Sequence, residues 1–202
     1  ATELNAGVSW IKQTSTFLSS ISLSADAFYN RITDKIVAMP TKNLFIWSMM
    51  NIGRVDIKGT EINAQLNFNL YKDIHLYMTG NYTWQRATDK NIMPYKATYN
   101  HQIPYTPRHS GSIRMNLDMP WISVGYTVLV SGERYCNQYN SSEYRMEGYH
   151  EHSLSLYRTF ELKKCSLSAQ VEALNFTNER YEVVKNYPMP GRQFRGSIIF
   201  KY

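Results

Sequence analysis

The stretch Glu61-Ile62-Asn63-Ala64-Gln65-Leu66-Asn67-Phe68 alternates polar and apolar side chains without a break. Successive side chains of a β-strand point to opposite faces, so this spacing puts the four apolar residues on one face and the four polar residues on the other. A helix would not separate the two sets in this way, because its period is about 3.6 residues. The stretch therefore predicts a strand between an apolar and a polar environment.

Eight other stretches alternate in the same way. They cover residues 3–10, 20–27, 75–84, 112–117, 122–131, 153–156, 166–173 and 194–202. Leu129 breaks the pattern. The composition agrees, because 16 Tyr, 8 Phe and 4 Trp with a mean hydropathy of -0.43 suit alternating strands better than helical bundles. The sequence predicts an all-β protein with nine strands.

The connections between these strands alternate in length. Short polar turns are expected near residues 14–16, 71–73, 118–120 and 161–163, and much longer segments near 35–53, 89–108, 138–146 and 178–191. An outer-membrane β-barrel has this rhythm, with tight turns at its periplasmic end and long loops outside the cell. A soluble β-sandwich has no reason to sort its loops by end.

The polar face carries charge at several strands. Its charged residues include Asp26, Glu61, Arg114, Glu172 and Arg195. So many ionisable groups cannot line a dry core unpaired, and this face must meet water. Alternation alone would also fit a sandwich with one solvated face. The membrane is favoured by the strand lengths and by aromatic residues near the strand ends, which would form the interfacial girdles.

The number of strands indicates whether this sheet could close into a barrel by itself. A closed single-chain bacterial barrel has an even number of strands, whereas nine would leave two unpaired edges. The chain also opens in a strand pattern, with neither an initiator Met nor a signal peptide. We therefore expect residues 1–202 to be the C-terminal part of a larger barrel, with the other strands on the N-terminal side of Ala1.

Other classes of protein are disfavoured. No apolar run reaches the roughly 18 residues that a membrane-spanning helix needs. The net charge is +6, but Lys and Arg are scattered, so we expect no nucleic-acid partner. Cys136 and Cys165 lie in unrelated contexts without metal-ligand spacing, and we expect no disulfide, metal or other cofactor.

Several motifs resemble the C-terminal barrel of TonB-dependent outer-membrane receptors, especially those of Bacteroides-like bacteria. Asn51-Ile52-Gly53 with Gly59-Thr60-Glu61 is similar to the pattern that opens a descending strand in that family. The segment from Ile103 to His109 resembles the approach to the next descending strand, and the segment from Glu172 to Tyr181 resembles the next-to-last strand and its loop. Tyr187-Pro188-Met189-Pro190-Gly191-Arg192-Gln193-Phe194 is the most specific match. The resemblance spans essentially the whole chain.

The resemblance implies a fold and a function. The chain would supply the last nine strands of a 22-stranded transmembrane barrel, and the plug that contacts TonB would lie outside it. The whole protein would be an active importer in the bacterial outer membrane, embedded in its lipid, and would carry a siderophore, vitamin, glycan or peptide. The alternatives are a passive outer-membrane barrel and a soluble β-sandwich binding module.

The candidate contact residues are aromatic and lie in the expected outer loops: Trp47, Tyr95, Tyr99, Tyr135 and Tyr139. Tyrosine offers a rigid ring with a polar tip, which suits a flat ligand. The apolar segment 43–50 could contact a substrate or a surface lipoprotein, or it could fold over the barrel mouth and bury itself. At the end of the chain, Phe200 and Tyr202 resemble the signal that the outer-membrane insertion machinery recognises.

An outer-membrane enzyme is a third class of function. His150 and His152 lie beside Ser153, and a serine nucleophile needs a base within hydrogen-bond reach. Adjacent residues of a strand point to opposite faces, however, so His152 and Ser153 should not meet. The sequence therefore predicts barrel wall at this position and no catalytic residue.

Overall fold

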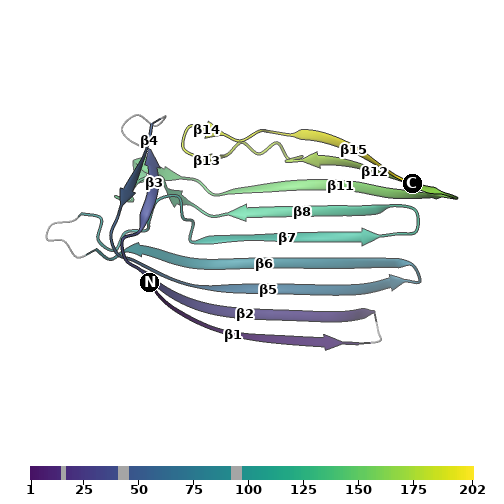
Figure 1. The fold of residues 1–202 in the computed structure, drawn as a ribbon, viewed down its shortest axis with the longest axis horizontal. Coiled ribbons are helices and arrows are strands. Elements are labelled where there is room, and N and C mark those ends of the chain that lie inside the picture. Colours follow the sequence, from purple (N-terminus) through teal and green to yellow (C-terminus); the bar gives the residue numbers. More distant parts are fainter. Residues whose placement is uncertain (15–16, 41–45, 92–96) are drawn as a thin grey trace.

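A computed structural model describes residues 1–14, 17–40, 46–91 and 97–202 of the chain. Nine long strands form one antiparallel sheet in the order β1-β2-β5-β6-β7-β8-β11-β12-β15 (Figure 1). Their bounds are β1 (Thr2–Gln13), β2 (Leu18–Ile32), β5 (Val55–Tyr71), β6 (Ile74–Asp89), β7 (His109–Asp118), β8 (Ser123–Ser131), β11 (Tyr149–Leu162), β12 (Cys165–Leu174) and β15 (Gln193–Lys201). The nine predicted strands are confirmed.

Most of the strands extend beyond the alternating stretches that predict them. β5 has 17 residues where the alternation covers 61–68, and β11 has 14 residues where it covers 153–156. Sheet pairing uses backbone N–H and C=O groups, so a ladder continues past the point where the side chains stop alternating. A strand that spans a bilayer needs only about 9–11 residues, and most of the extra length of β2, β5 and β6 lies at one end of the sheet.

That end also carries the long connections (Figure 1). Three of these connections contain short hairpins that alternation did not predict: β3 (Ile36–Pro40) with β4 (Trp47–Asn51), β9 (Arg134–Tyr135) with β10 (Arg145–Met146), and β13 (Glu182–Val184) with β14 (Tyr187–Pro188). A 3₁₀ turn, η1 (Ser142–Tyr144), precedes β10. The opposite end carries the short turns and the C-terminus. The predicted sorting of loops by length is confirmed.

The strand register aligns the apolar sets of all nine strands on one face. Ala25 of β2 lies opposite Ile62 of β5, and Ile62 lies opposite Tyr82 of β6. At the far side of the sheet, Ala169 of β12 lies opposite Ile198 of β15. This apolar face is open, since Val8, Phe194 and Ile198 are 68%, 76% and 74% exposed. A contiguous apolar surface of this extent marks a face that contacts lipid or another apolar partner.

The sheet is open at β1 and β15, because each of these strands pairs with one neighbour among the described residues. A β-sandwich would need a second large sheet packed on the first. The described strands form one nine-stranded sheet and three two-stranded hairpins, which does not match the two packed sheets of the sandwich alternative. Within the same residues, no helix has the length and apolar character to cross a membrane.

Candidate functional site

Apart from Gly59, which lies within β5, every buried residue of the described chain lies at the long-loop end of the sheet. An apolar cluster there consists of Ile52, Val55, Ala87 and Ile103. The buried polar and charged residues join it from the neighbouring strand ends and loops: Thr88, Asp89, Thr98, Gln102, Arg134 and Asn175. The long loops are therefore packed against the strand ends and form a structured outer end, the part of the molecule best placed to hold a ligand.

The loop between β6 and β7 is fixed by Gln102, which is buried. Its side-chain oxygen accepts from Ala87 N at 3.2 Å, and its side-chain nitrogen donates to Thr106 O at 3.2 Å. Its backbone exchanges two hydrogen bonds with the amide of Asn140, at 2.7 and 2.9 Å. Two long loops are thus bonded to each other through backbone and amide groups, which satisfies polar atoms that burial would otherwise leave unpaired.

Two of the family-like motifs have a structural role here. In Asn51-Ile52-Gly53, the Asn51 side chain accepts from Gly53 N at 2.8 Å, and Gly53 adopts a φ of 80°, which favours glycine. Asn175 adopts a φ of 46°, and its amide both donates to Glu179 O and accepts from Glu179 N at 2.9 Å. Both motifs shape the turns where the long loops meet the sheet.

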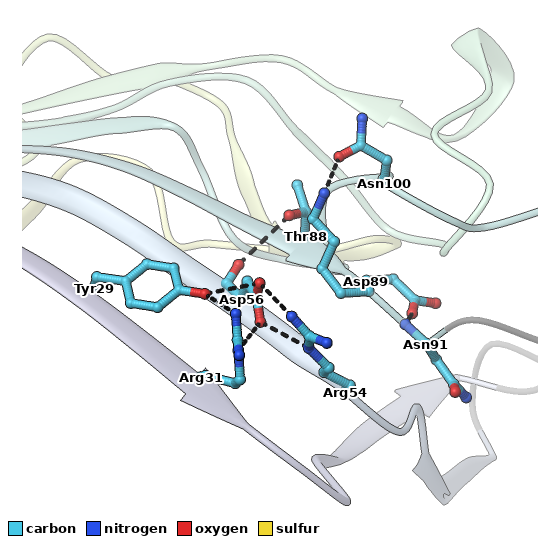
Figure 2. Close-up of polar contacts among 9 residues, drawn as sticks. Tyr29, Arg31, Arg54, Asp56, Thr88, Asp89, Asn91 and Asn100 are labelled. Atoms are coloured by element: carbon cyan, nitrogen blue, oxygen red, sulfur yellow. Dashed lines mark hydrogen bonds and ion pairs between the residues drawn. The ribbon is translucent and has the colours of Figure 1, made fainter. Parts of the chain in front are cut away.

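We call the apolar face of the sheet the outward face and the polar face the inward face. A charged network lies on the outward face at the ends of β2 and β5 (Figure 2). Arg31 and Arg54 converge on the carboxylate of Asp56, with the shortest contacts at 3.3 and 3.1 Å. The Tyr29 hydroxyl donates to Asp56 Oδ2 at 2.9 Å and accepts from Arg31 at 2.8 Å. One carboxylate therefore holds two guanidinium groups on the outside of the sheet.

On the opposite, inward side of the outer end, aromatic residues surround a cavity of about 420 Å³. Trp47 comes from β4, Tyr105 from the β6–β7 loop and Tyr149 from the start of β11, and the lining also includes Arg134 and Val183. The Trp47 and Tyr105 rings are 6.0 Å apart at 32°. A mostly apolar cavity with a few polar groups is the usual form of a small-molecule site.

Arg134 connects the elements that surround the cavity. Its guanidinium lies 5.3 Å from the centre of the Tyr149 ring and donates to Glu147 O at 3.3 Å and to Val183 O at 3.3 Å. It also donates to Glu182 O. Tyr149 stacks on Tyr181, with ring centres 4.0 Å apart. Arg134 thereby ties the β9–β10 hairpin to the β13–β14 hairpin.

Burial changes the acid–base properties of three groups in these loops. It raises the pKa of Tyr105 to about 12, against a smaller lowering effect of a hydrogen bond with the Lys185 backbone. Burial also raises the pKa of the Cys136 thiol. The pKa of Tyr181 is raised by burial and by its hydrogen bond to the Glu151 carboxylate. All three groups are therefore protonated near neutral pH.

The five aromatic residues predicted to contact a ligand do not form one group. Trp47 lines the cavity, whereas Tyr99 lies against the Lys90 ammonium, 5.3 Å away, and is half exposed. Tyr135 belongs to β9, and Tyr139 is 61% exposed. Tyr95 lies outside the described residues. The contact role of all five stays a prediction.

The sequence did not predict the other residues of the cavity. Tyr105 stands between two prolines in a segment that was noted only for its family resemblance, and Tyr149 directly precedes the noted His150. Nothing in the sequence around Arg134 predicts its role, because the local sequence does not distinguish a buried arginine from an exposed one. A search for aromatic residues at strand starts would have found Tyr149.

The apolar segment 43–50 lies only partly within the described residues. Its described part includes Trp47, Met49 and Met50 of β4, and Met49 is 75% exposed. Trp47 contributes to the cavity while Met49 faces away from protein contacts. In the β3–β4 hairpin, Trp47 therefore lines the cavity, and Met49 is an apolar side chain exposed on the surface.

The inward face of the sheet is polar, as the sequence predicts. Arg195 and Glu172 form an ion pair at 2.5 Å across β12 and β15. Asp26 and Glu61 are direct neighbours across β2 and β5, and they line a hollow of about 540 Å³ with Glu3. Two carboxylates side by side repel each other unless water or a cation separates them, so this face requires a wet or polar partner.

The serine–histidine alternative fails on geometry. His150 and His152 share the outward face, and His152 Nδ1 lies 2.7 Å from the Tyr126 hydroxyl. Ser153 belongs to the inward set, where its hydroxyl accepts from Asn175 N at 3.4 Å. His152 cannot serve as the base for Ser153. No cluster of three or more His, Cys, Asp or Glu residues suited to a metal occurs in the described ranges.

The C-terminal residues lie at the short-turn end. Phe200 and Tyr202 stack with ring centres 6.3 Å apart, and Tyr202 is fully exposed. Their role as an insertion signal stays a prediction.

One antiparallel sheet with an open apolar face, a polar inward face and loops sorted by length defines the wall of an outer-membrane type of β-barrel. The family model "TonB dependent receptor-like, beta-barrel" matches residues 1–176. The chain belongs to this family. No curated protein sequence matches it.

Solved structures share the fold. The ferric preacinetobactin receptor BauA from Acinetobacter baumannii aligns with a TM-score of 0.68 and 12% identity over 99% of this chain and 29% of the receptor. The ferric-catecholate import receptor Fiu from E. coli K12 aligns with a TM-score of 0.63 and 20% identity, over 98% and 26%. The copper transporter OprC gives 0.67 and 14%, over 99% and 30%. The chain spans less than a third of each of these structures.

Proposed function

We propose that this chain is part of the barrel wall of a TonB-dependent importer in the bacterial outer membrane. The observation that carries the proposal is the family match, and it agrees with an open apolar face next to a polar inward face. The neighbours in structure are named as receptors or transporters of iron complexes or copper. By this proposal the imported nutrient is a small molecule, and TonB is contacted through a plug region outside these residues.

The cavity at the outer end is the proposed contact point for the nutrient. It combines the aromatic rings of Trp47, Tyr105 and Tyr149 with a guanidinium group, Arg134, on the inward side. Rings of this kind stack on flat or apolar parts of a ligand. The polar inward face below the cavity would meet the plug.

Uptake by cells tests active import. Cells that produce the full-length protein, with and without TonB, are given a labelled ferric siderophore, a vitamin, an oligosaccharide and a peptide. We expect uptake of one of these classes to require both the protein and TonB. Uptake that persists without TonB would favour the alternative of a passive barrel, and no TonB-dependent uptake of any probe would contradict the proposal.

Substitutions at the cavity test the contact point. Trp47→Ala or Tyr149→Ala removes a ring from the lining, and the loss of a stacked aromatic contact weakens binding by about tenfold. Tyr144→Ala is the matched control, because Tyr144 of η1 is an exposed aromatic residue of the same outer end that does not line the cavity. Equal uptake KM in all three variants would place the contact elsewhere.

A surface lipoprotein is a second partner suggested for this region. The exposed Met49 edge of the β3–β4 hairpin is the observation that favours it. Cross-linking from Met49→Cys in intact cells would detect such a partner, and the absence of any cross-linked protein would contradict it.

A further inference from the structure

Four cations gather on the outward face at the outer ends of β2, β5 and β6. They are Arg31, Arg54, Lys58 and Arg86, and we call them the outer cationic patch. Register places Tyr29 opposite Lys58 and Lys58 opposite Arg86, while Arg31 lies opposite Asp56. These positions share a face with the apolar residues Ala25, Ile62 and Tyr82. The patch is therefore on the face of the sheet that contacts lipid in the proposed membrane barrel.

The charges of the patch are not balanced. Arg31 and Arg54 share the single carboxylate of Asp56 (Figure 2). Within the described part of the chain, the side chains of Lys58 and Arg86 make no ion pair or hydrogen bond. Four cations and one anion leave a local charge of about +3. Lys58 and Arg86 are direct cross-strand neighbours, and like charges in that arrangement destabilise a sheet. An anion between them would relieve the repulsion.

The patch lies just beyond an aromatic belt. Moving along β5 and β6 toward the short turns, the next outward pair is Thr60 with Trp84, and the one after it is Ile62 with Tyr82. Two strand residues cover roughly 7 Å. Trp and Tyr settle at the level of the lipid headgroups, where the apolar core of a bilayer ends. Lys58 and Arg86 are thus at the depth of the headgroups themselves.

We propose that the outer cationic patch binds the phosphate of an anionic lipid in the outer leaflet. Arginine offers a planar fork of donors that matches phosphate oxygens, and lysine adds a mobile point charge. Asp56 holds Arg31 and Arg54 in place, and Lys58 and Arg86 supply the unpaired charge. This inference rests on the proposed membrane orientation of the sheet but not on the import of any nutrient.

The apolar strip below the patch makes the occupant a lipid. Ile62, Ala64 and Leu66 continue the same outward set of β5 toward the short turns. A phosphorylated lipid can contact the cations through its headgroup and this strip through its acyl chains. A free phosphate ion would use the cations alone, and it would forgo the apolar contact that contributes most of the burial energy of a lipid.

Lipid binding by the full-length protein in detergent tests the proposal. The variant is Lys58→Gln with Arg86→Gln, which removes the unpaired charges. The matched control is Lys72→Gln with Arg114→Gln, which removes the same two charge types from a short turn and from the inward face. The probes are a bis-phosphorylated glycolipid, the same glycolipid without phosphate, and inorganic phosphate, and bound lipid is counted by native mass spectrometry.

We expect the phosphorylated glycolipid to bind the wild type and the control variant equally, and the patch variant about twenty-five-fold more weakly, from roughly fivefold for each of the two cations at a membrane surface. The dephosphorylated glycolipid should bind all three proteins alike. Equal binding of the phosphorylated lipid to the patch variant would overturn the proposal. Displacement of the lipid by inorganic phosphate at equal concentration would identify a free-anion site and would also overturn it.

The same proteins separate this inference from the proposed function. TonB-dependent uptake should be unchanged in the patch variant, because the cavity lies on the other face of the sheet. A wild-type protein that stays monodisperse without detergent would refute the membrane assignment itself. If the protein requires detergent but the wild type and the patch variant bind the phosphorylated glycolipid equally, only the lipid site is refuted.

Discussion

The nine-stranded wall and the outer end of this molecule are stabilised in different ways. Along the middle of the wall no described residue is buried, and apolar side chains such as Val8 and Ile198 stand open. At the outer end, Val55 and Ala87 are completely covered, and Gln102, Arg134 and Asn175 are buried with their hydrogen bonds made. The wall depends on its surroundings for apolar contact, whereas the outer end contains its own core.

This difference indicates how each region tolerates change. In the wall, the face on which a residue lies should decide the effect of a substitution, because the proposed membrane barrel has lipid on one side of the sheet and a polar interior on the other. At the outer end, individual contacts should decide it, because each buried polar group has specific partners.

The largest effect is expected for a charge on the apolar face. Leu66→Arg places a guanidinium among Ile21 and Met78, and we expect it to lower the free energy of unfolding in lipid vesicles by about 2–4 kcal/mol. Gln65→Arg, one residue away on the inward face, is the control and should change stability by less than half of that amount. Denaturant titration of the full-length protein measures both. Equal losses would show that the two faces do not differ.

A smaller and more local effect is expected for Arg134→Ala. It leaves the carbonyls of Glu182 and Val183 without their buried donor, at a cost of about 1–3 kcal/mol. The control is Arg145→Ala, since the Arg145–Glu133 pair is half exposed or more and contributes about 0–1 kcal/mol.

Hydrogen exchange locates the change made by Arg134→Ala. Protection should fall in the loops at 132–148 and 175–192 and should stay unchanged in β5 and β6. Loss of protection throughout the wall would mean that the two regions are one cooperative unit.

The smallest effect concerns thiol reactivity. Cys136 is buried at the outer end and burial raises its pKa, whereas Cys165 lies partly exposed beside a short turn. The thiolate is the reactive form, so below pH 9 a maleimide should label Cys165 faster than Cys136. Labelling of Cys136 should accelerate in the Arg134→Ala variant. Rapid labelling of Cys136 in the wild type would show that the outer end opens readily.

The sequence predicted the wall better than the outer end. The alternating residues of 61–68 and their counterparts located all nine strands and their faces, although strands such as β5 and β11 extend beyond the predicted stretch at both ends. The hairpins within the long connections were not predicted, because strands such as Arg134–Tyr135 are too short to show a period. Trp47 was chosen as a contact residue, but Tyr105, Arg134 and Tyr149 were not.

Alternation by itself determined that this protein is a sheet with one apolar and one polar face, since a period of two is a local property of the backbone. Loop lengths by themselves determined which strand ends lie together. Only the tertiary structure decided the cavity and the outer cationic patch. Both depend on contacts between residues far apart in the chain, such as Arg134 with Val183 and Lys58 with Arg86, and register and packing bring these residues together.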